Sequence, residues 1–392
     1  MRVAMLTYSV KPRGGVEHAL AVAEALAGRG HEVCLSALAP PGEAFFRPTC
    51  VEVATHIVEH VPAAPVFDER ILAMVDAYRD GLRPLLAGGG FEIVHAQDCI
   101  SANAALDLRD EGVIAHVVRT VHHVDDFISP SLIACQDRSI LEPDLVLCVS
   151  QPWIERLAGE FAVDARLVRN GVDRDRFRAP RDAAERAADR AALGLGDRLT
   201  VLTVGGIEPR KGSLTLLEGF AKLRAEAPER DPLLLIVGGA TLFDYRDEID
   251  RFAVRARELG VSDHVRIVGT VTPAELERHY RAADVFAFPS TKEGFGLVAL
   301  EALAAGLPVV ASEIDVFLTF LSHGESALLS PPGDGCALGG SLVRLARDPG
   351  LRERLVAGGR HVVDAYGWDA AAVAHEDAYR SFHADPMIGA LS

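Results

Sequence analysis

Short apolar runs alternate with helical patterns along almost the whole chain, and this alternation constrains the fold more than any other feature. The first run covers residues 2–8, and the helical pattern after it places Ala19, Ala23, Leu26 and Ala27 on one side. Strand, helix, strand in this order requires parallel pairing through crossover connections. We therefore predict an α/β protein with doubly wound parallel sheets. The other strand-like runs are residues 31–36, 92–95, 115–120, 145–150, 199–206, 233–238, 265–269, 285–288 and 308–311.

A break between two such series follows Asn170–Gly171–Val172–Asp173, where Asn-Gly marks a turn. The Arg-, Asp- and Ala-rich segment 174–190 predicts an exposed helix between two cores. A chain of 392 residues is also long for one core. We predict Rossmann-like domains over 1–172 and 173–366, and a helix in 367–392 that packs back across the join.

Composition excludes some classes of function. The net charge of −16 argues against nucleic acid as a partner, and less strongly against an anionic membrane surface. Residues 1–8 lack the pattern of a secretory peptide, and no run approaches the ~20 apolar residues of a transmembrane segment, so we expect a cytoplasmic protein. The six cysteines form no C-x-x-C pair, which predicts buried reduced thiols rather than disulfides or a zinc site.

Two carboxylates flank a Gly-Phe-Gly turn after the apolar run 285–288. Glu293 precedes the turn, and Glu301 lies about two helical turns further along at ~3.6 residues per turn. The start of a helix there offers unpaired N–H groups to a ligand. Ligands of parallel sheets bind beyond the carboxyl ends of the strands, so we expect both carboxylates to face one cleft and to suit a polyol.

Two other loops at strand ends carry groups that suit phosphate. Gly14 and Gly15 open the first helix, where the backbone can approach an anion closely, although a plain strand-to-helix turn would look the same. Arg210 and Lys211 stand at the mouth of another helix and could neutralise a pyrophosphate, although such a pair is also typical of solvated surface.

Together these motifs resemble glycosyltransferase family 4. The resemblance rests on Glu293 and Glu301 within 290–311, on Gly14–Gly15–Val16–Glu17, on residues 170–173 and on Pro209–Arg210–Lys211–Gly212, so it spans most of the chain. It implies the GT-B fold, in which two Rossmann-like domains face each other across a cleft. It also implies a retaining, hexosyltransferase-like enzyme that uses a nucleotide-activated sugar, for which we expect a UDP- or GDP-sugar. Because the sequence contains no convincing Asp-x-Asp metal motif, we expect that no metal or other cofactor is required. Residues 7–15 and 122–127 further resemble a bacterial subfamily associated with a nitrilase-containing biosynthetic gene cluster.

The resemblance assigns roles to individual residues. It implies that Glu301 binds the ribose of the donor, that Glu293 binds its sugar and that Lys211 binds the pyrophosphate. His122 would touch the transferred sugar from the first domain, with the adjacent His123 as the competing assignment. Lys211, Glu293 and His122 are thus the candidate catalytic residues. The other candidate donor-binding residues are Gly14, Gly15, Gly206, Arg210, Gly294, Phe295, Gly296 and Leu297.

One position departs from the family. Members usually carry an arginine where this chain has Gly206. Either Arg210 or an arginine from elsewhere in the chain would then supply the second cation. If neither does, the leaving group would be less well stabilised. The departure supports a non-catalytic nucleotide-sugar-binding protein as an alternative. A sugar-nucleotide epimerase of the same fold is the nearest alternative enzyme. A nicotinamide oxidoreductase is disfavoured because no Gly-x-Gly-x-x-Gly follows the first strand.

The acceptor is expected on the loops of the first domain, after Tyr8, around residues 45–48, and near Gln97–Asp98 and residues 122–126. Residues 1–170 carry 14 basic and 23 acidic side chains, a balance of −9. Because no basic amphipathic surface is evident, we favour a soluble small molecule over a lipid. Asp125 and Asp126 could be metal ligands, but a polar loop explains them as well. The sequence leaves the oligomeric state open.

Overall fold

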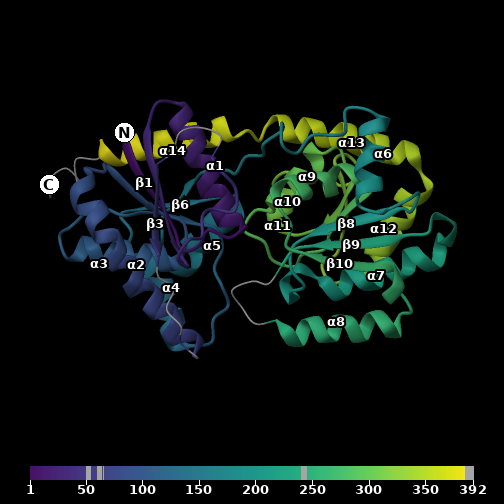
Figure 1. Cartoon of the computed structure of the whole chain (residues 1–392), viewed down its shortest axis with the longest axis horizontal. Coiled ribbons are helices and arrows are strands. Elements are labelled where there is room, and N and C mark those ends of the chain that lie inside the picture. The colour runs from purple at the N-terminus through teal and green to yellow at the C-terminus, as the bar shows by residue number, and fades with distance from the viewer. Residues whose placement is uncertain (50–53, 60–63, 65, 240–244, 385–392) are drawn as a thin grey trace. The chain divides into compact units, whose positions relative to one another are not determined.

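The computed structural model describes residues 1–49, 54–59, 64, 66–239 and 245–384, so Cys50 and the tail after residue 384 lie outside the described part. The chain divides into two compact units: unit 1 is Met1–Gly171 with Trp368–Ser392, and unit 2 is Val172–Gly367. Each unit contains one parallel sheet with helices on both faces (Figure 1). The prediction of two doubly wound parallel sheets is therefore confirmed.

The sheet of unit 1 has the strand order β3-β2-β1-β4-β5-β6-β7, and every neighbouring pair is parallel. Its central strands are buried along almost their whole length, as expected for a sheet covered on both faces. Strand order reverses between β1 and β4, which marks the carboxyl ends of these strands as the expected ligand-binding edge. The strands are β1 Arg2–Thr7, β2 Glu32–Ala39, β3 Ala54–Glu59, β4 Ile93–Ala96, β5 Val118–Val121, β6 Leu145–Cys148 and β7 Arg166–Leu167.

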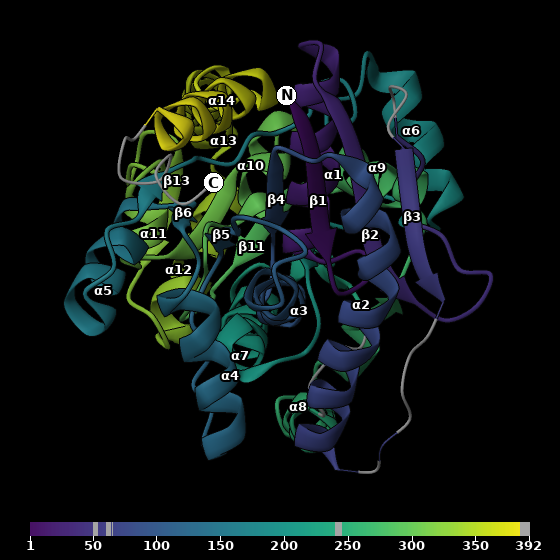
Figure 2. The same ribbon diagram turned by 90° about the vertical axis from the view of Figure 1, so that its left-hand side faces the viewer.

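The helices of unit 1 divide between the two faces of its sheet. Helix α1 (Gly14–Gly28) packs with α14 (Trp368–His383) on one face. Helices α2 (Phe67–Gly89), α3 (Cys99–Asp110) and α4 (Pro130–Leu141) pack together on the other (Figure 2). Helix α5 (Gln151–Phe161) contacts β6 and β7.

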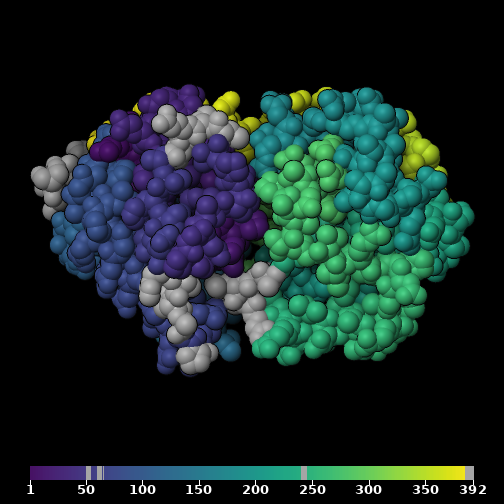
Figure 3. Space-filling model, in the orientation of Figure 1, coloured from purple at the N-terminus to yellow at the C-terminus, as the bar shows by residue number. Residues whose placement is uncertain are grey.

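Residues far apart in the sequence thus share one core in unit 1. Side chains of α14, among them Ala372, Tyr379 and Phe382, join the apolar cluster of β1 and α1. The yellow C-terminal residues accordingly lie against the purple N-terminal residues along the upper edge of this unit (Figure 3). The buried Glu376 of α14 accepts hydrogen bonds from Arg29 and is 2.9 Å from His31.

The sheet of unit 2 has the order β10-β9-β8-β11-β12-β13 and is also entirely parallel. The order reverses between β8 and β11, so the carboxyl ends of these two strands form the equivalent edge. The strands are β8 Thr200–Val204, β9 Leu233–Val237, β10 Val265–Gly269, β11 Val285–Phe288, β12 Val309–Ser312 and β13 Ala327–Ser330.

The helices of unit 2 cover both faces of this sheet, and α7 packs closely against α12. Helix α6 packs on α9, where Arg281 binds the buried Asp189. The helices are α6 Ala183–Ala192, η1 Pro209–Lys211, α7 Ser213–Glu226, η2 Pro228–Arg230, α8 Arg246–Glu258, η3 Ser262–His264, α9 Pro273–Ala282, α10 Leu297–Ala304, α11 Asp315–Leu318, α12 Gly335–Arg347 and α13 Pro349–Asp364.

Some local expectations differ from the structure. The strand expected over 115–120 begins only at Val118, because the N–H of Val117 donates to the side chain of Asp144 rather than to a neighbouring strand. The charged segment 174–190 is helical only from Ala183 and belongs to unit 2. Of the five described cysteines, all are free, and Cys336 is exposed rather than buried. None of the helices in the described ranges is long and apolar enough to cross a membrane.

Candidate functional site

Of the two carboxylates that the sequence singled out, Glu293 lies in the loop between β11 and α10, and Glu301 lies in α10. The loop reaches α10 through Gly296, which has a φ of +99°. Glycine adopts this backbone conformation without strain, whereas other residues do not. A Cβ at this position would also lie 2.6 Å from Cε1 of Phe317. The helix begins only at Leu297, so Glu301 lies little more than one turn into it. The expected separation of about two helical turns between Glu293 and Glu301 therefore holds for the number of residues but not for the helix itself.

A cluster of four charged side chains lies where this loop meets η1. The ammonium of Lys211 is 2.7 Å from Oε1 of Glu293 and 4.8 Å from the centre of the Phe288 ring. Nη1 of Arg210 is 3.5 Å from the same carboxylate oxygen. Nε of Arg210 is 2.9 Å from Oε2 of Glu208, a residue that is only 3% exposed. Two cations and two carboxylates therefore balance in a small volume.

The charge balance keeps Glu293 ionised although it is buried. Burial acts to raise the pKa of Glu293, but Lys211 and then Arg210 act in the opposite direction. The pKa of the carboxyl consequently lies below its usual value. A buried carboxylate that stays ionised can accept hydrogen bonds from the hydroxyls of a ligand.

The backbone holds η1 against the Glu293 loop. Gly212 has a φ of +65°, and a Cβ there would lie 2.1 Å from the carbonyl oxygen of Pro289. The N–H of Thr291 donates to the carbonyl of Arg210 at 2.8 Å. Gly205 (φ +142°) and the half-buried Gly206 connect β8 to this segment. Only glycine permits the approach at position 212, and that approach places Lys211 beside Glu293.

Glu301 has a separate partner on α9. The hydroxyl of Tyr280 donates to Oε2 of Glu301 at 2.7 Å, and both side chains are buried. Burial, together with the charge of Glu301, raises the pKa of Tyr280 well above its usual value, so the phenol remains a donor. The bond fixes one oxygen of Glu301 and leaves its carboxylate oriented by α9.

The candidates of unit 1 meet at the start of α1. Gly14 and Gly15 are its first two residues, and a Cβ at Gly15 would lie 3.5 Å from the ring of His122. Nε2 of His122 is 3.0 Å from Oε1 of Gln97. His123 instead is exposed, and its Nε2 is 3.2 Å from Oδ1 of Asp125. The structure therefore brings His122, rather than His123, together with Gly15.

The loop around residues 45–48 does not present its aromatic side chains as a free binding surface. Phe45 and Phe46 pack against the apolar core of unit 1. Arg47 is buried and forms ion pairs with Glu17 at 3.1 Å and Glu24 at 2.8 Å, both on α1. These contacts fasten the loop to α1.

In unit 2 the structure brings Arg210, Lys211 and Glu293 together, and it gives Glu301 a partner of its own. Phe295 contributes only backbone to this region, because its side chain is 4% exposed and stacks on Phe320 at 5.4 Å. Sequence reasoning missed four partners of the candidate residues. They are Glu208, Tyr280, Phe288 and, as the partner of His122, Gln97.

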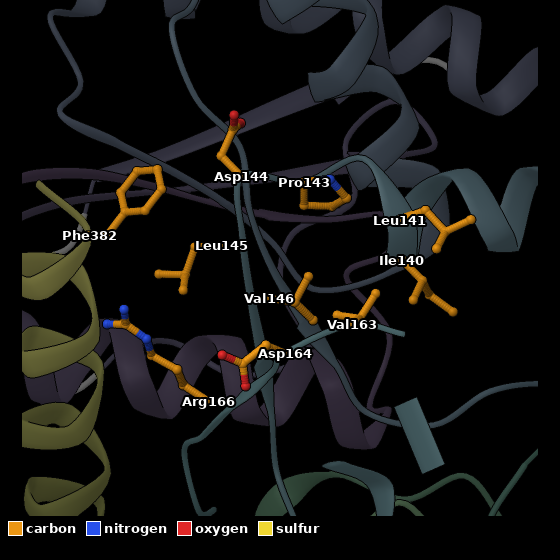
Figure 4. A pocket seen from close by; sticks show the side chains of 10 residues that line it. All are labelled: Ile140, Leu141, Pro143, Asp144, Leu145, Val146, Val163, Asp164, Arg166 and Phe382. Carbon is orange, nitrogen blue, oxygen red and sulfur yellow. The ribbon is translucent and has the colours of Figure 1, made fainter. Parts of the chain in front are cut away.

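A hollow of about 310 Å³ in unit 1 lies away from all candidate residues (Figure 4). It is lined by the end of α4, the first residues of β6, and Phe382 of α14, together with Arg166. Leu145 and Val146 belong to the amino-terminal half of β6, whereas ligands of parallel sheets bind beyond the carboxyl ends. We therefore place the candidate site at the charged cluster and not at this hollow.

Two family models match the chain. Residues 12–176 match the model described as Glycosyltransferase Family 4, and residues 185–362 match the one described as Glycosyl transferases group 1. A D-inositol 3-phosphate glycosyltransferase of Streptomyces bingchenggensis is 32% identical, over 96% of this chain and 89% of the relative. A phosphatidyl-myo-inositol mannosyltransferase of Mycobacterium leprae is 31% identical, over 95% and 94%.

Solved structures show the same architecture. Sucrose-phosphate synthase of Thermosynechococcus elongatus superposes with a TM-score of 0.81 at 25% identity, covering 98% of this chain and 99% of that one. Anabaena HepE, solved in complex with UDP-glucose, has a TM-score of 0.75 at 19% identity, with coverage of 97% and 100%. At that identity the likeness concerns the fold alone.

Proposed function

The chain belongs to glycosyltransferase family 4 and has the GT-B fold, and on this premise we propose that it is a retaining transferase that moves a sugar from a nucleoside diphosphate to a small hydroxylated acceptor. The observation that carries the proposal is the contact of Lys211 with the buried, ionised Glu293. This pair offers a cation for phosphate and an acceptor for sugar hydroxyls within one small volume.

Most donor-binding residues of the proposal lie in unit 2, and the other two are Gly14 and Gly15 of unit 1. Lys211 binds the diphosphate, together with backbone N–H groups from Gly294 to Leu297, while Arg210 stays beside Glu293 as its second cationic neighbour. Glu293 accepts hydrogen bonds from the transferred sugar, and Glu301, oriented by Tyr280, accepts them from the ribose. We assign His122 of unit 1 to the hydroxyls of the transferred sugar, because it is ordered by Gln97 and Gly15 whereas His123 is exposed.

Bond cleavage in this scheme requires stabilisation of the departing nucleoside diphosphate. Negative charge develops on its phosphate oxygens as the bond to the sugar breaks. Lys211 and the N–H groups at the start of α10 would stabilise that charge with no metal ion, since preorganised donors are most effective in a site of low polarity. The leaving phosphate would then take the proton of the acceptor on the same face of the sugar, which preserves the anomeric configuration.

We propose a UDP-sugar as the first donor to test and a GDP-sugar as the second. One structural neighbour was solved with UDP-glucose, which supports this order. For the acceptor we propose a small soluble polyol. The two relatives are named for D-inositol 3-phosphate and phosphatidyl-myo-inositol, so compounds that contain an inositol ring lead the acceptor panel.

The test begins with thermal shifts in UDP, GDP and their sugars, since a ligand at about 100 times its Kd stabilises by about 2.7 kcal/mol. Turnover is then measured with a labelled donor against inositol, its phosphate and phosphatidylinositol vesicles, with and without a metal chelator. NMR of the product reports the anomeric configuration. We expect Lys211→Ala and Glu293→Gln to abolish transfer without loss of the fold. Near-normal transfer in both variants would refute the site assignment.

A non-catalytic nucleotide-sugar-binding protein remains the second candidate, because Gly206 replaces the usual arginine of the family. Donor binding without transfer or hydrolysis across the acceptor panel would favour it. An epimerase would reveal itself through a changed sugar on the labelled nucleotide, since no acceptor would become labelled.

A further inference from the structure

A chain of hydrogen bonds links His122 to the C-terminal helix within unit 1. Nε2 of His122 is 3.0 Å from Oε1 of Gln97, and Nε2 of Gln97 is 3.1 Å from Nε2 of His95. Nδ1 of His95 is 2.7 Å from the hydroxyl of Tyr379 on α14. Gln97, His95 and Tyr379 are each at most 2% exposed, so this is a buried polar network that must be satisfied internally.

The direction of each bond follows from the surroundings of Gln97. Its amide nitrogen is also 2.9 Å from the sulfur of Met5, and a thioether accepts hydrogen bonds but cannot donate them. The amide N–H groups therefore point toward Met5 and His95, and the amide oxygen points toward His122. An oxygen in that place accepts, so Nε2 of His122 must carry the proton.

The hydrogen-bond directions inferred at Gln97 also fit the surroundings of His95. Its Nε2 is 3.1 Å from the amide nitrogen of Gln97 and 2.7 Å from the hydroxyl of Thr120, and the two donors share its single lone pair. Nδ1 of His95 then carries the proton and donates to Tyr379. Burial lowers the pKa of His95 well below its usual value, and the neighbouring histidines lower it further. The ring therefore stays neutral, with Nδ1 as the donor and Nε2 as the acceptor.

The ring of His122 is also confined sterically. The backbone of Gly15 lies along it, since a Cβ there would be 3.5 Å from Cδ2 of His122. The ring of His18 meets it edge-on with a centroid distance of 4.8 Å, and Nδ1 of His18 is held 2.5 Å from Asn170. Within the described ranges, no group hydrogen-bonds Nδ1 of His122, and this atom is not among the buried polar atoms that lack a partner. Nδ1 is thus the accessible nitrogen.

We propose that Gln97 is a positioning residue that holds His122 as its Nε2–H tautomer, so that Nδ1 accepts a hydrogen bond from a substrate hydroxyl, and that His95 and Tyr379 fix the orientation of Gln97. The kinetic part of this inference rests on the proposed function, because it assumes that His122 meets a sugar. The tautomer itself does not, and it can be measured in the protein without any substrate.

The first experiment is therefore NMR of the full chain labelled with ¹⁵N-histidine. The signals of His122 are assigned by their loss in His122→Asn. We expect a single neutral tautomer with the proton on Nε2 in the wild type. In Gln97→Leu we expect both tautomers, because Nε2 loses its acceptor. A proton on Nδ1 in the wild type would overturn the proposal whether or not the protein transfers sugar.

Thr120→Val provides the matched control. It removes another buried hydrogen bond to His95 with almost no change of shape and leaves the bond between Gln97 and His122 in place. We expect it to lower thermal stability to a similar extent as Gln97→Leu but to leave the tautomer of His122 unchanged. If Thr120→Val disturbs His122 as much as Gln97→Leu does, the network is merely structural and the proposal fails.

Kinetics then test the consequence for turnover. We expect Gln97→Leu to reduce kcat about tenfold, comparable to the loss of one oriented hydrogen bond, with a smaller change in KM. With a deoxy donor that lacks the hydroxyl contacted by His122, the variant and wild type should have equal kcat. In Gln97→Glu the carboxylate should raise the pKa of His122 and introduce a new acidic limb in the pH profile of kcat. An unchanged kcat in Gln97→Leu, or an unchanged profile in Gln97→Glu, would refute a positioning role.

Discussion

Replacement of Lys211 by methionine isolates the contact on which the candidate site depends. Methionine keeps an apolar stem over Phe288 but removes the ammonium that is 2.7 Å from Oε1 of Glu293. The carboxylate, which belongs to a residue 9% exposed, then retains Arg210 at 3.5 Å as its cationic neighbour in η1. In the variant, the buried negative charge of Glu293 is therefore balanced less well than in the wild type.

The magnitude follows from the distances. At an effective dielectric constant of 20, the Coulomb attraction is about 6 kcal/mol at 2.7 Å and about 5 kcal/mol at 3.5 Å, before desolvation is subtracted. Loss of one partner of a buried pair costs roughly 3–5 kcal/mol, and the remaining Arg210 reduces this. We expect unit 2 to lose about 2–3 kcal/mol at pH 7, which corresponds to a fall in Tm of roughly 5–10 °C.

The pH dependence has a definite sign. The pKa of Glu293 is lowered in the folded wild type, so its ionised form stabilises the fold above its unfolded pKa of about 4.3, and this contribution is lost as the pH falls through the folded value. Without Lys211, the pKa of Glu293 should rise relative to the wild type, because only Arg210 then opposes the effect of burial. The difference in stability between variant and wild type should therefore be constant near pH 7 and disappear in acid, once the carboxyl is protonated in both.

Urea denaturation of the wild type, of Lys211→Met, and of Lys211→Met combined with Glu293→Gln measures these differences from pH 7 into acid. The double variant should recover most of the lost stability, because it removes the unpaired charge. Lys222→Met, which breaks an exposed ion pair with Glu226 in the same unit, should have little effect on stability, because water and salt screen such a pair. A pH-independent loss, or a double variant as unstable as the single one, would refute the reasoning.

Three further perturbations test other parts of the structure. Tyr280→Phe removes the donor to Glu301 and should weaken UDP binding about 5–10-fold by calorimetry, as expected for one hydrogen bond, whereas an unchanged Kd would contradict the ribose assignment. Gly296→Ala should lower the free energy of unfolding, measured in urea, by about 1–3 kcal/mol. The reason is that φ at this position is +99° and the new methyl would lie 2.6 Å from Cε1 of Phe317. A variant as stable as the wild type would show that the loop relaxes. Hydrogen bonding from Arg29 lowers the pKa of Glu376 to about 2. Glu376→Gln should therefore destabilise unit 1 above about pH 4.3 and have progressively less effect toward pH 2. A loss of stability that does not vary with pH would show that the charge of Glu376 is not its cause.

The alternation of apolar runs was sufficient to predict both sheets, because central strands of a parallel sheet are buried on both faces and are apolar throughout. The strands β3 and β7 escaped notice because they lie at an edge of the sheet, where polar and exposed residues interrupt the pattern. The strand β13 is only four residues long. Its buried Leu328 and Leu329 do not form a run that stands out from their surroundings.

The candidate site was predictable in its members but not in its contacts. Lys211 and Glu293 are separated by 82 residues, and no local pattern indicates that their side chains meet. Tyr280 reaches Glu301 from a different helix, where its surroundings resemble those of any aromatic core residue. Glu208 belongs to a charged segment that is typical of solvated surface, yet it is 3% exposed. Burial of this kind depends on tertiary packing, which spacing along the chain does not encode.

The charge balance of the cluster bears on the position occupied by Gly206. Before any ligand binds, the ammonium of Lys211 is engaged by Glu293, and the guanidinium of Arg210 spans Glu208 and Glu293. A diphosphate that draws Lys211 away would leave Glu293 to Arg210, whose Nη1 is already 3.5 Å from it. A planar guanidinium suits that double contact better than an ammonium, because its donors diverge in a fixed fork. Arg210 would therefore act by keeping Glu293 ionised while Lys211 serves the phosphates, which is a different duty from that of a second phosphate-binding cation.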